Sequence, residues 1–194
     1  MKKLIIVLSL GLMPWAMFGQ TKWNVDAAHS SVKFTVSHLV ISEVEGSFKK
    51  FNGSISTSNP DFSGASIEFT VDVKSISTDN DMRDNHLKSP DFFDAEKFPE
   101  MTFKSTSFKK ISGNKYELVG DLTMHGVTKS VKFSVDYGGT MNDGMGNTKA
   151  GFKATAVIDR FNYGLKWSKA TETGGLVVGN EVTINIRLEF AKAK

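Results

Sequence analysis

The chain has 194 residues, a length that predicts one domain or at most two small ones. Apolar residues make up 40% of it and charged residues 23%, which is typical of a globular protein and excludes a disordered acidic or basic tail. The chain has 15 Phe against three Trp and three Tyr, and this bias indicates a large apolar interior or an apolar cavity. It has no Cys, which excludes disulfide scaffolds, thiolate metal sites and thiol catalysis.

Residues 1–19 have the pattern of a secretory signal peptide. A short basic start, Met1–Lys3, precedes the apolar run Leu4–Leu12, and a small residue stands before Gln20, where we expect the cut. The run is too short for a transmembrane anchor. The alternative is an uncleaved interfacial anchor, because Met17 is bulky for the position three residues before the cut.

The charge balance gives no sign of a nucleic-acid partner. Removal of the signal segment takes away Lys2 and Lys3 and lowers the net charge from +3 to +1. The remaining lysines alternate with acidic and small polar residues and form no basic face. We therefore expect one domain over residues 20–194, with no nucleic-acid partner and no stable membrane insertion. Whether it is a monomer or a homodimer stays open.

The dominant pattern after the signal segment is alternation of apolar and polar residues. It is clearest over Val182–Phe190, where every second side chain is apolar. This period of two predicts strands with one buried face. Burial of each such side chain is worth about 1.5–3 kcal/mol, so a slip in register would be costly. The predicted strands are 22–27, 31–37, 44–58, 64–76, 100–112, 115–125, 127–139, 148–160 and 180–191.

These segments predict an all-β fold, an eight-stranded antiparallel barrel. Nine segments for eight strands means that the first short run is expected to join the second. Turn signals, including Asn52-Gly53 and Gly138-Gly139, separate the segments. A closed up-and-down barrel leaves no exposed strand edge, and a β-sandwich is the alternative.

One stretch breaks the alternation and predicts a short helical insertion. Thr78–Lys88 offers N-cap candidates at its start and an Asp84–Lys88 pair at helical spacing. Phe92 and Phe93 follow, and their adjacent rings need cover. Because the predicted helix stands between two barrel strands in the sequence, we expect it to lie across one end of the barrel.

Motifs for catalysis and metal binding do not occur. The sequence has no Gly-x-Ser-x-Gly elbow, no His-Glu-x-x-His and no phosphate-binding glycine loop. None of the four histidines, His29, His38, His86 and His125, has a second histidine two or four residues on. The residues therefore predict no metal, no cofactor and no enzymatic activity, and the histidines read as ordinary hydrogen-bonded or exposed side chains.

Three blocks of residues nevertheless form a specific pattern in a fixed order. They are Arg83-Asp84-x-His86-Leu87 with Asp91-Phe92-Phe93-Asp94, Gly120-Asp121-Leu122-Thr123-Met124-His125-Gly126, and Ile158-Asp159-Arg160-x-x-Tyr163-Gly164. With them the chain resembles the YceI-like family of bacterial lipid- or polyisoprenoid-binding proteins over nearly all of 22–192.

The resemblance implies a lipocalin-like barrel with a lengthwise apolar cavity. Such a cavity would hold an isoprenoid or another long-chain amphiphile, and the protein would be exported to the periplasm. The Phe-rich alternating stripes suit that lining, and they suit a solid core equally well.

A long-chain ligand needs an apolar tunnel and a few groups that orient its polar head. The expected wall residues are Phe34, Val36, Phe69, Val71, Phe133, Ile184 and Ile186, and the expected polar residues are Arg83, His125 and Arg160. Arg83 is the first candidate for the head group, because a guanidinium offers several donors to a phosphate or hydroxyl. The alternative is that Arg83 and Asp84 anchor the helix to the barrel through an ion pair.

The preferred function is binding, for storage or transport of the ligand. One alternative is an enzyme that acts on an isoprenoid-type substrate through His125 or the Arg83–Asp84 pair. The other is a solid-core structural barrel without a ligand. A cavity of a few hundred Å³ or more would favour the ligand.

Overall fold

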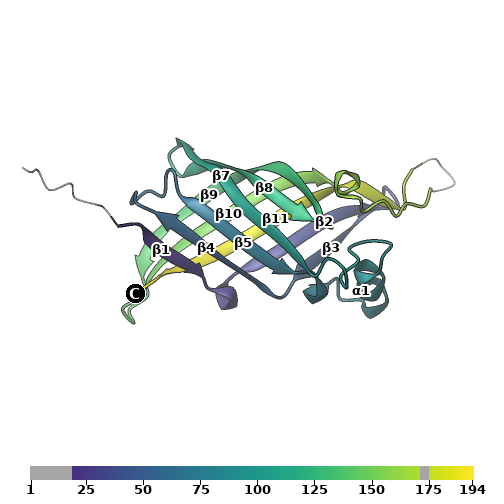
Figure 1. Cartoon of the computed structure of the whole chain (residues 1–194), viewed down its shortest axis with the longest axis horizontal. Helices are drawn as coiled ribbons and strands as arrows, with labels where there is room; N and C mark the ends of the chain where they lie inside the picture. The colour runs from purple at the N-terminus through teal and green to yellow at the C-terminus, as the bar shows by residue number, and fades with distance from the viewer. Residues whose placement is uncertain (1–18, 171–174) are drawn as a thin grey trace, which may run out of the picture.

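The computed structural model describes residues 19–170 and 175–194, so most of the predicted signal peptide lies outside the described residues. The described strands form one closed antiparallel sheet, drawn in Figure 1. They are β1 (Thr21–Val25), β2 (Ser31–His38), β3 (Ser42–Phe48), β4 (Phe51–Thr57), β5 (Ser66–Asp72), β6 (Ile76–Ser77), β7 (Glu100–Ser112), β8 (Lys115–Met124), β9 (Val127–Asn142), β10 (Thr148–Asp159) and β11 (Val178–Lys192).

Some of these strands are segments of one longer barrel strand, so together they make up the eight full-length strands, or staves, of a closed barrel. β1 and β2 are two halves of one stave, because β1 pairs with β4 while β2 pairs with β3, which runs on into β4. β5 and β6 form the third stave, broken by the 3-10 turn Val73–Ser75. β11 then pairs with both β1 and β2 and closes the ring. The predicted barrel and the joining of the first two runs are confirmed, and the sandwich is excluded.

The prediction of a turn at Asn52-Gly53 is wrong. Both residues lie inside β4, where Gly53 pairs with Phe69 of β5. A Cβ on Gly53 would lie 2.2 Å from the ring of Phe69, so this glycine leaves room for a ring instead of making a turn.

The turn predicted at Gly138-Gly139 is also wrong. Both residues lie within β9, where Gly139 pairs with Gly151 while Tyr137 pairs with Phe152. Gly138 is therefore the extra residue of a β-bulge.

The helical insertion is confirmed, although it is shorter than predicted. α1 spans Asp81–Lys88, and Asn80 caps it by accepting a hydrogen bond from the Arg83 amide at 2.9 Å. The preceding Asp79 has a φ of 58°, outside the helical region, so the helix cannot begin at Thr78. α1 lies at the end of the barrel drawn on the right in Figure 1.

The half of the barrel farther from α1 is filled with aromatic rings. Phe62 enters it from the loop before β5, with a φ of 62° and only 1% exposure. Its ring packs against the rings of Trp23, Tyr137 and Phe152 at centroid distances of 5.2–5.5 Å. This half is therefore a solid core.

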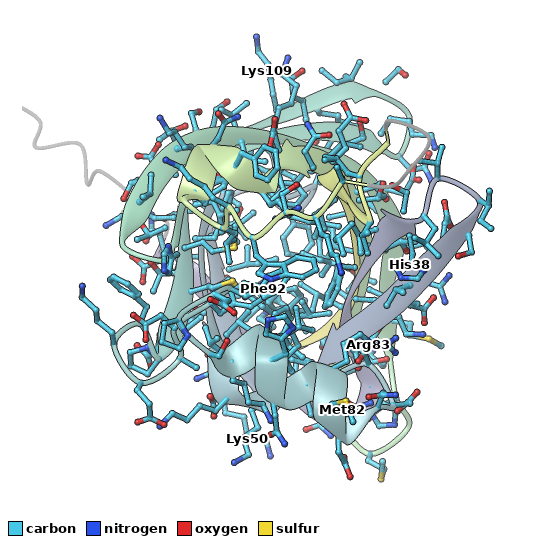
Figure 2. The ribbon with its side chains drawn as sticks, turned by 90° about the vertical axis from the view of Figure 1, so that its right-hand side faces the viewer. His38, Lys50, Met82, Arg83, Phe92 and Lys109 are labelled. Atoms are coloured by element: carbon cyan, nitrogen blue, oxygen red, sulfur yellow. The ribbon has the colours of Figure 1, made fainter. Side chains whose placement is uncertain are left out.

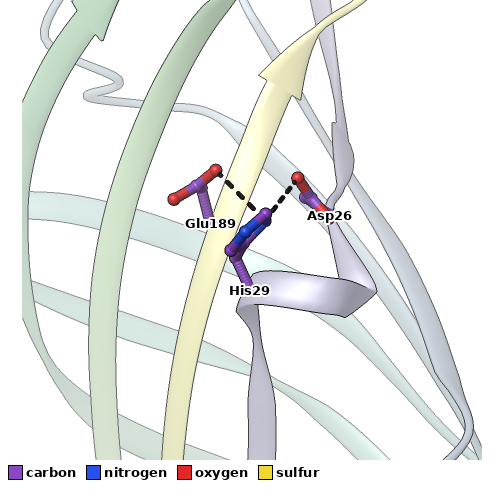
Figure 3. Close-up of side chains that lie close together, drawn as sticks. All are labelled: Asp26, His29 and Glu189. Atoms are coloured by element: carbon purple, nitrogen blue, oxygen red, sulfur yellow. Dashed lines mark hydrogen bonds and ion pairs between the residues drawn. The ribbon is translucent and has the colours of Figure 1, made fainter. Parts of the chain in front are cut away.

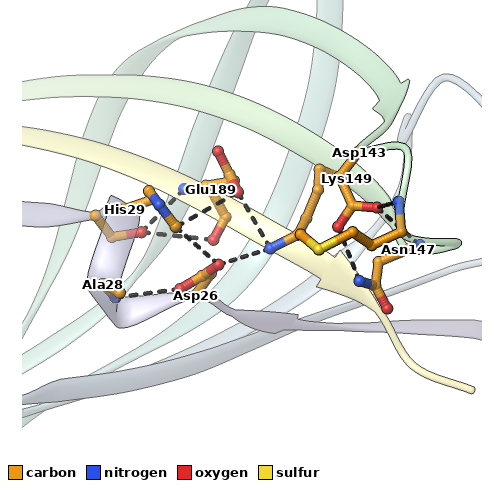
Figure 4. Close-up of polar contacts among 9 residues, drawn as sticks. Asp26, Ala28, His29, Asp143, Asn147, Lys149 and Glu189 are labelled. Atoms are coloured by element: carbon orange, nitrogen blue, oxygen red, sulfur yellow. Dashed lines mark hydrogen bonds and ion pairs between the residues drawn. The ribbon is translucent and has the colours of Figure 1, made fainter.

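A polar cluster spans the seam where the first and last strands meet. Asp26 stands at the bend between β1 and β2, and its carboxylate lies 2.6 Å from the Lys149 ammonium of β10. The same ammonium lies 3.2 Å from Glu189 of β11, and His29 Nδ1 lies 3.0 Å from Asp26 (Figures 3 and 4). The Lys149 and His29 contacts lower the pKa of Asp26 to about 2. The cluster ties three staves together at the bend of the first stave, where its pairing with β11 is interrupted between Val25 and Ser31.

The pKa of Asp26 predicts how stability depends on pH. Because this pKa is lowered on folding, the stabilisation is complete above pH 3.8 and disappears as the pH falls toward 2. We expect Asp26→Asn to lose about 1 kcal/mol of unfolding free energy at neutral pH and to match the parent near pH 2. Urea unfolding of the variant and the parent between pH 2 and neutral pH measures both differences in unfolding free energy. Glu45→Gln, which breaks the exposed pair with Lys33, is the control and should change little. An Asp26→Asn deficit that persists at pH 2 would contradict this assignment.

Candidate functional site

The half of the barrel next to α1 encloses an apolar cavity of about 150 Å³. Apart from Lys33, Thr102 and Arg160, every residue that lines it is apolar. Its wall comprises Val32, Phe34, Val36, Phe48, Phe69, Val71, Leu87, Phe92, Phe93, Met101, Phe103, Leu122, Met124, Ile158, Leu165, Val178, Val182, Ile184 and Ile186. The cavity shows that this half is not solid. Its volume is below the few hundred Å³ expected of a barrel that holds a large ligand.

Glycines in the strands keep this half open. Three lining phenylalanines each lie against a strand glycine, at the place that a side chain would otherwise take. The pairs are Phe34 with Gly46, Phe69 with Gly53, and Phe103 with Gly120. A Cβ on these glycines would lie 2.2–2.4 Å from the ring. The rings can therefore rest on the wall of the barrel rather than fill its centre.

The chain between β6 and β7 covers the end of the cavity. Leu87 of α1 and the following Phe92 and Phe93 contribute to the lining. The Phe92 ring lies 5.0 Å from the ring of His86 and 5.3 Å from that of Trp167, which precedes β11. Figure 2, which looks onto this end, shows Phe92 near its middle. Aromatic contacts between two loop segments thus form the cover, without strand pairing.

Arg160 stands at the rim of the cavity and is 4% exposed. Its guanidinium donates hydrogen bonds to the carbonyl oxygens of Gly179, Leu165, Trp167 and Val178 at 2.5–3.0 Å. Burial lowers the pKa of this guanidinium. Arg160 therefore joins the segment before β11 to the start of that strand.

Arg83 does not line the cavity. Its Nε donates to the Thr78 hydroxyl at 2.7 Å and its Nη2 to the Thr78 carbonyl at 2.8 Å. The buried Asp84 carboxylate accepts from the Thr78 amide and hydroxyl at 2.8 and 2.6 Å. The anchor of the helix is thus Thr78, held by both side chains, and not an Arg83–Asp84 ion pair.

Seven of the ten predicted site residues lie together on the cavity wall: Phe34, Val36, Phe69, Val71, Arg160, Ile184 and Ile186. The other three lie elsewhere. Phe133 is 5% exposed and packs edge-on against Phe103 at 5.5 Å. His125 forms the turn after β8, and its Nδ1 lies 3.1 Å from the Tyr163 carbonyl oxygen. Arg83 is held by Thr78. Their roles toward a ligand stay predictions.

The covering residues of the cavity are absent from the predicted site residues. Leu87, Phe92 and Phe93 come from the insertion, whose sequence has no strand periodicity. The signal that could have found them is the adjacent pair of phenylalanines, which needs apolar cover on both sides of the chain.

The seam cluster also brings together three groups that could bind a metal ion. Ligand atoms of Asp26, His29 and Glu189 lie within 4.8 Å of one another (Figure 3). The Lys149 ammonium already contacts both carboxylates, so a cation there would have to displace it.

A family model described as the YceI-like domain matches residues 23–190. The chain belongs to the YceI-like family. A UPF0312 protein of Staphylococcus aureus strain N315 is 39% identical over 172 residues, which cover 88% of this chain and 98% of that protein.

Solved structures share the fold. BcnA of Burkholderia cenocepacia is 28% identical with a TM-score of 0.74, covering 85% of this chain and 98% of that one. The Campylobacter jejuni YceI protein is 33% identical with a TM-score of 0.70, covering 81% and 90%. A Saccharophagus degradans domain described as polyisoprenoid-binding is 16% identical with a TM-score of 0.64, covering 88% and 98%, a likeness of fold alone.

Gly46 provides a test of how the cavity stays open. A Cβ there would lie 2.3 Å from the Phe34 ring and 2.9 Å from Thr78 Cγ2. We expect Gly46→Ala to cost about 1–3 kcal/mol of unfolding free energy, and less in a Phe34→Leu background. Denaturant unfolding of the four proteins of this cycle measures the coupling. Gly151→Ala is the matched control, because nothing lies within 4 Å of its Cβ position. Equal losses with and without the Phe34 ring would refute the pairing.

Arg83 provides a test of how the helix is anchored. Because Arg83 donates to Thr78, Arg83→Met should lower the unfolding free energy by about 1–3 kcal/mol and leave the affinity of the folded protein for a lipid unchanged. Thermal unfolding and lipid titration separate the two effects. Lys88→Met on the same helix is the control. Weakened lipid binding at unchanged stability would instead assign Arg83 to the head group.

Proposed function

We propose that this protein is an exported binding protein for the hydrocarbon chain of a long-chain amphiphile, a polyisoprenoid or a similar lipid. The observation that carries the proposal is the cavity, which is enclosed on one side by a solid aromatic core and lined almost wholly by apolar side chains. Such a lining offers hydrocarbon contacts and few polar partners, so storage or transport fits it better than chemistry.

The cavity must widen to accept a long chain. An apolar space of about 150 Å³ suits a single six-carbon ring. The strands of the wall are held to one another by backbone pairing, with one irregularity between Val178 and Val182 of β11. Leu87, Phe92 and Phe93 instead belong to a cover whose contact with Trp167 is made by side chains. The cover is therefore the part that can move aside as the chain enters.

The comparisons support a lipid as the ligand. The Saccharophagus degradans structure is described as a polyisoprenoid-binding domain, and it has the same barrel fold. The hydrophobic start of the sequence supports export to the periplasm through a signal peptide cut before Gln20. In the described residues, no helix has the length and apolar character needed to cross a membrane.

The enzyme alternative has less support. His125 and Arg83, the residues that would carry it, both lie outside the cavity lining and bind backbone or threonine oxygens. The cavity itself argues against a solid structural barrel.

The proposal predicts that a lipid copurifies with the protein. Protein isolated from its native host is analysed by native mass spectrometry and by solvent extraction, and its N-terminus is sequenced. We expect a long-chain or isoprenoid molecule at near-stoichiometric amount. A protein that is empty and also binds no isoprenoid or fatty acyl probe would refute the proposal.

A cavity-filling variant locates the site. Ile184→Trp places a large ring in the lining and should lower lipid affinity at least tenfold. The control is Val157→Trp on the outer wall, where Val157 is 58% exposed, and it should bind as the parent does.

A further inference from the structure

The turn between β2 and β3 exposes three consecutive aliphatic side chains. Leu39 is 41% exposed, Val40 71% and Ile41 87%. Hairpin turns are usually built from Gly, Asn, Asp or Pro, which supply the backbone geometry and are polar or small. This apolar tip is therefore a departure from what the turn itself requires.

The backbone of the tip is strained. Leu39 has a φ of 53° and Val40 a φ of 67°, both in the left-handed region. A β-branched residue is rare there, because its side chain clashes with the neighbouring carbonyl. Asn-Gly at these positions would form the same turn without that cost. The chain keeps aliphatic residues at the expense of stability, and strain of this kind points to a role in function.

The tip stands beside the entrance to the cavity. His38 pairs with Val178, which lines the cavity, and the Leu39 amide donates to the Val177 carbonyl at 2.9 Å. The Val177 amide in turn donates to the Lys169 carbonyl at 2.8 Å. On α1, at the same end of the barrel, Met82 is 84% exposed (Figure 2).

We propose that this end of the barrel docks on the surface of a lipid bilayer, with Val40 and Ile41 inserted among the acyl chains. A projecting tip of aliphatic side chains suits the bilayer interior better than a protein groove, which would demand a shaped surface. Lys166 and Lys169, on either side of Trp167, form no ion pair with a carboxylate among the described residues, and lipid phosphates could meet them. The contact is peripheral.

The inference rests on the proposed function and deepens it by naming the source of the ligand. A long-chain lipid leaves a membrane only at the cost of exposing its chain to water. Docking would bring the Phe92 cover against the bilayer. The hydrocarbon chain of the lipid could then pass from the acyl layer into the cavity without being exposed to water.

The test uses the chain begun at Gln20, because the apolar N-terminal run would itself bind vesicles and every described strand lies within 21–192. Vesicles of phosphatidylethanolamine and phosphatidylglycerol are sedimented with the protein. The tip variant is Val40→Asn with Ile41→Ser. The matched control is Met141→Ser with Met145→Ser at the opposite end, where the exposures are 70% and 83%.

We expect the parent and the control to sediment with vesicles, even in about 0.5 M NaCl, where attraction between charges is screened. The tip variant should bind at least tenfold less. Val40→Asn alone should raise Tm by about 2–4 °C, because asparagine tolerates the left-handed conformation. A single change that stabilises the fold and weakens docking would show that the strain serves the contact.

Three results would overturn the docking proposal. The first is that the parent does not bind vesicles, and the second is that the tip variant binds them as well as the control does. The third is that light scattering shows a dimer of the parent, that the tip variant is a monomer, and that neither protein binds vesicles. Titration of a solubilised isoprenoid in the absence of vesicles is run alongside. Because it does not involve the tip, it reports on the proposed function separately, and the tip variant should bind this probe as the parent does.

Discussion

The whole molecule depends on the closure of the sheet by β11. On one edge this strand pairs with β10 along most of its length, and on the other it pairs with both halves of the first stave. Pairing is interrupted where that stave bends, and other contacts bridge the gap: the Asp26 amide donates to the Glu189 carbonyl at 2.7 Å, and Lys149 lies between their carboxylates. Because the ring is closed, side chains that alternate along each strand point alternately into the barrel and out of it.

One pattern of alternation produces two different interiors. In the half farther from α1, the Phe62 ring enters from a loop and completes a solid aromatic core. In the other half, glycines such as Gly46 let the rings lie against the wall, and a space remains. The number of aromatic residues does not decide which half is hollow. What decides it is whether a ring stands opposite a glycine or opposite another large side chain.

The parts of this fold that depend on local sequence were predictable. Alternation located the strands and implied their inward faces, which is why Phe34 and Ile184 could be assigned to the wall. The glycines misled because their function is set by a partner on another strand: Gly53 accommodates the Phe69 ring and makes no turn. Arg83 could not be placed for the same reason, since only the folded chain brings its guanidinium to Thr78.

The hydrogen bonds of Arg160 at the rim of the cavity limit which groups of a ligand the protein can recognise. A guanidinium has five N–H donors, and Arg160 directs four hydrogen bonds to backbone carbonyl oxygens, so it has little left to offer a ligand. Its positive charge is accommodated by carbonyl dipoles and by the faces of Phe92 and Phe161. The cavity thus presents hydrocarbon, and among the described lining residues the buried cation Arg160 holds the rim together. Selectivity should then follow the length, branching and stiffness of the chain, because those properties decide how far the cover must move, while the head group stays at the entrance near water.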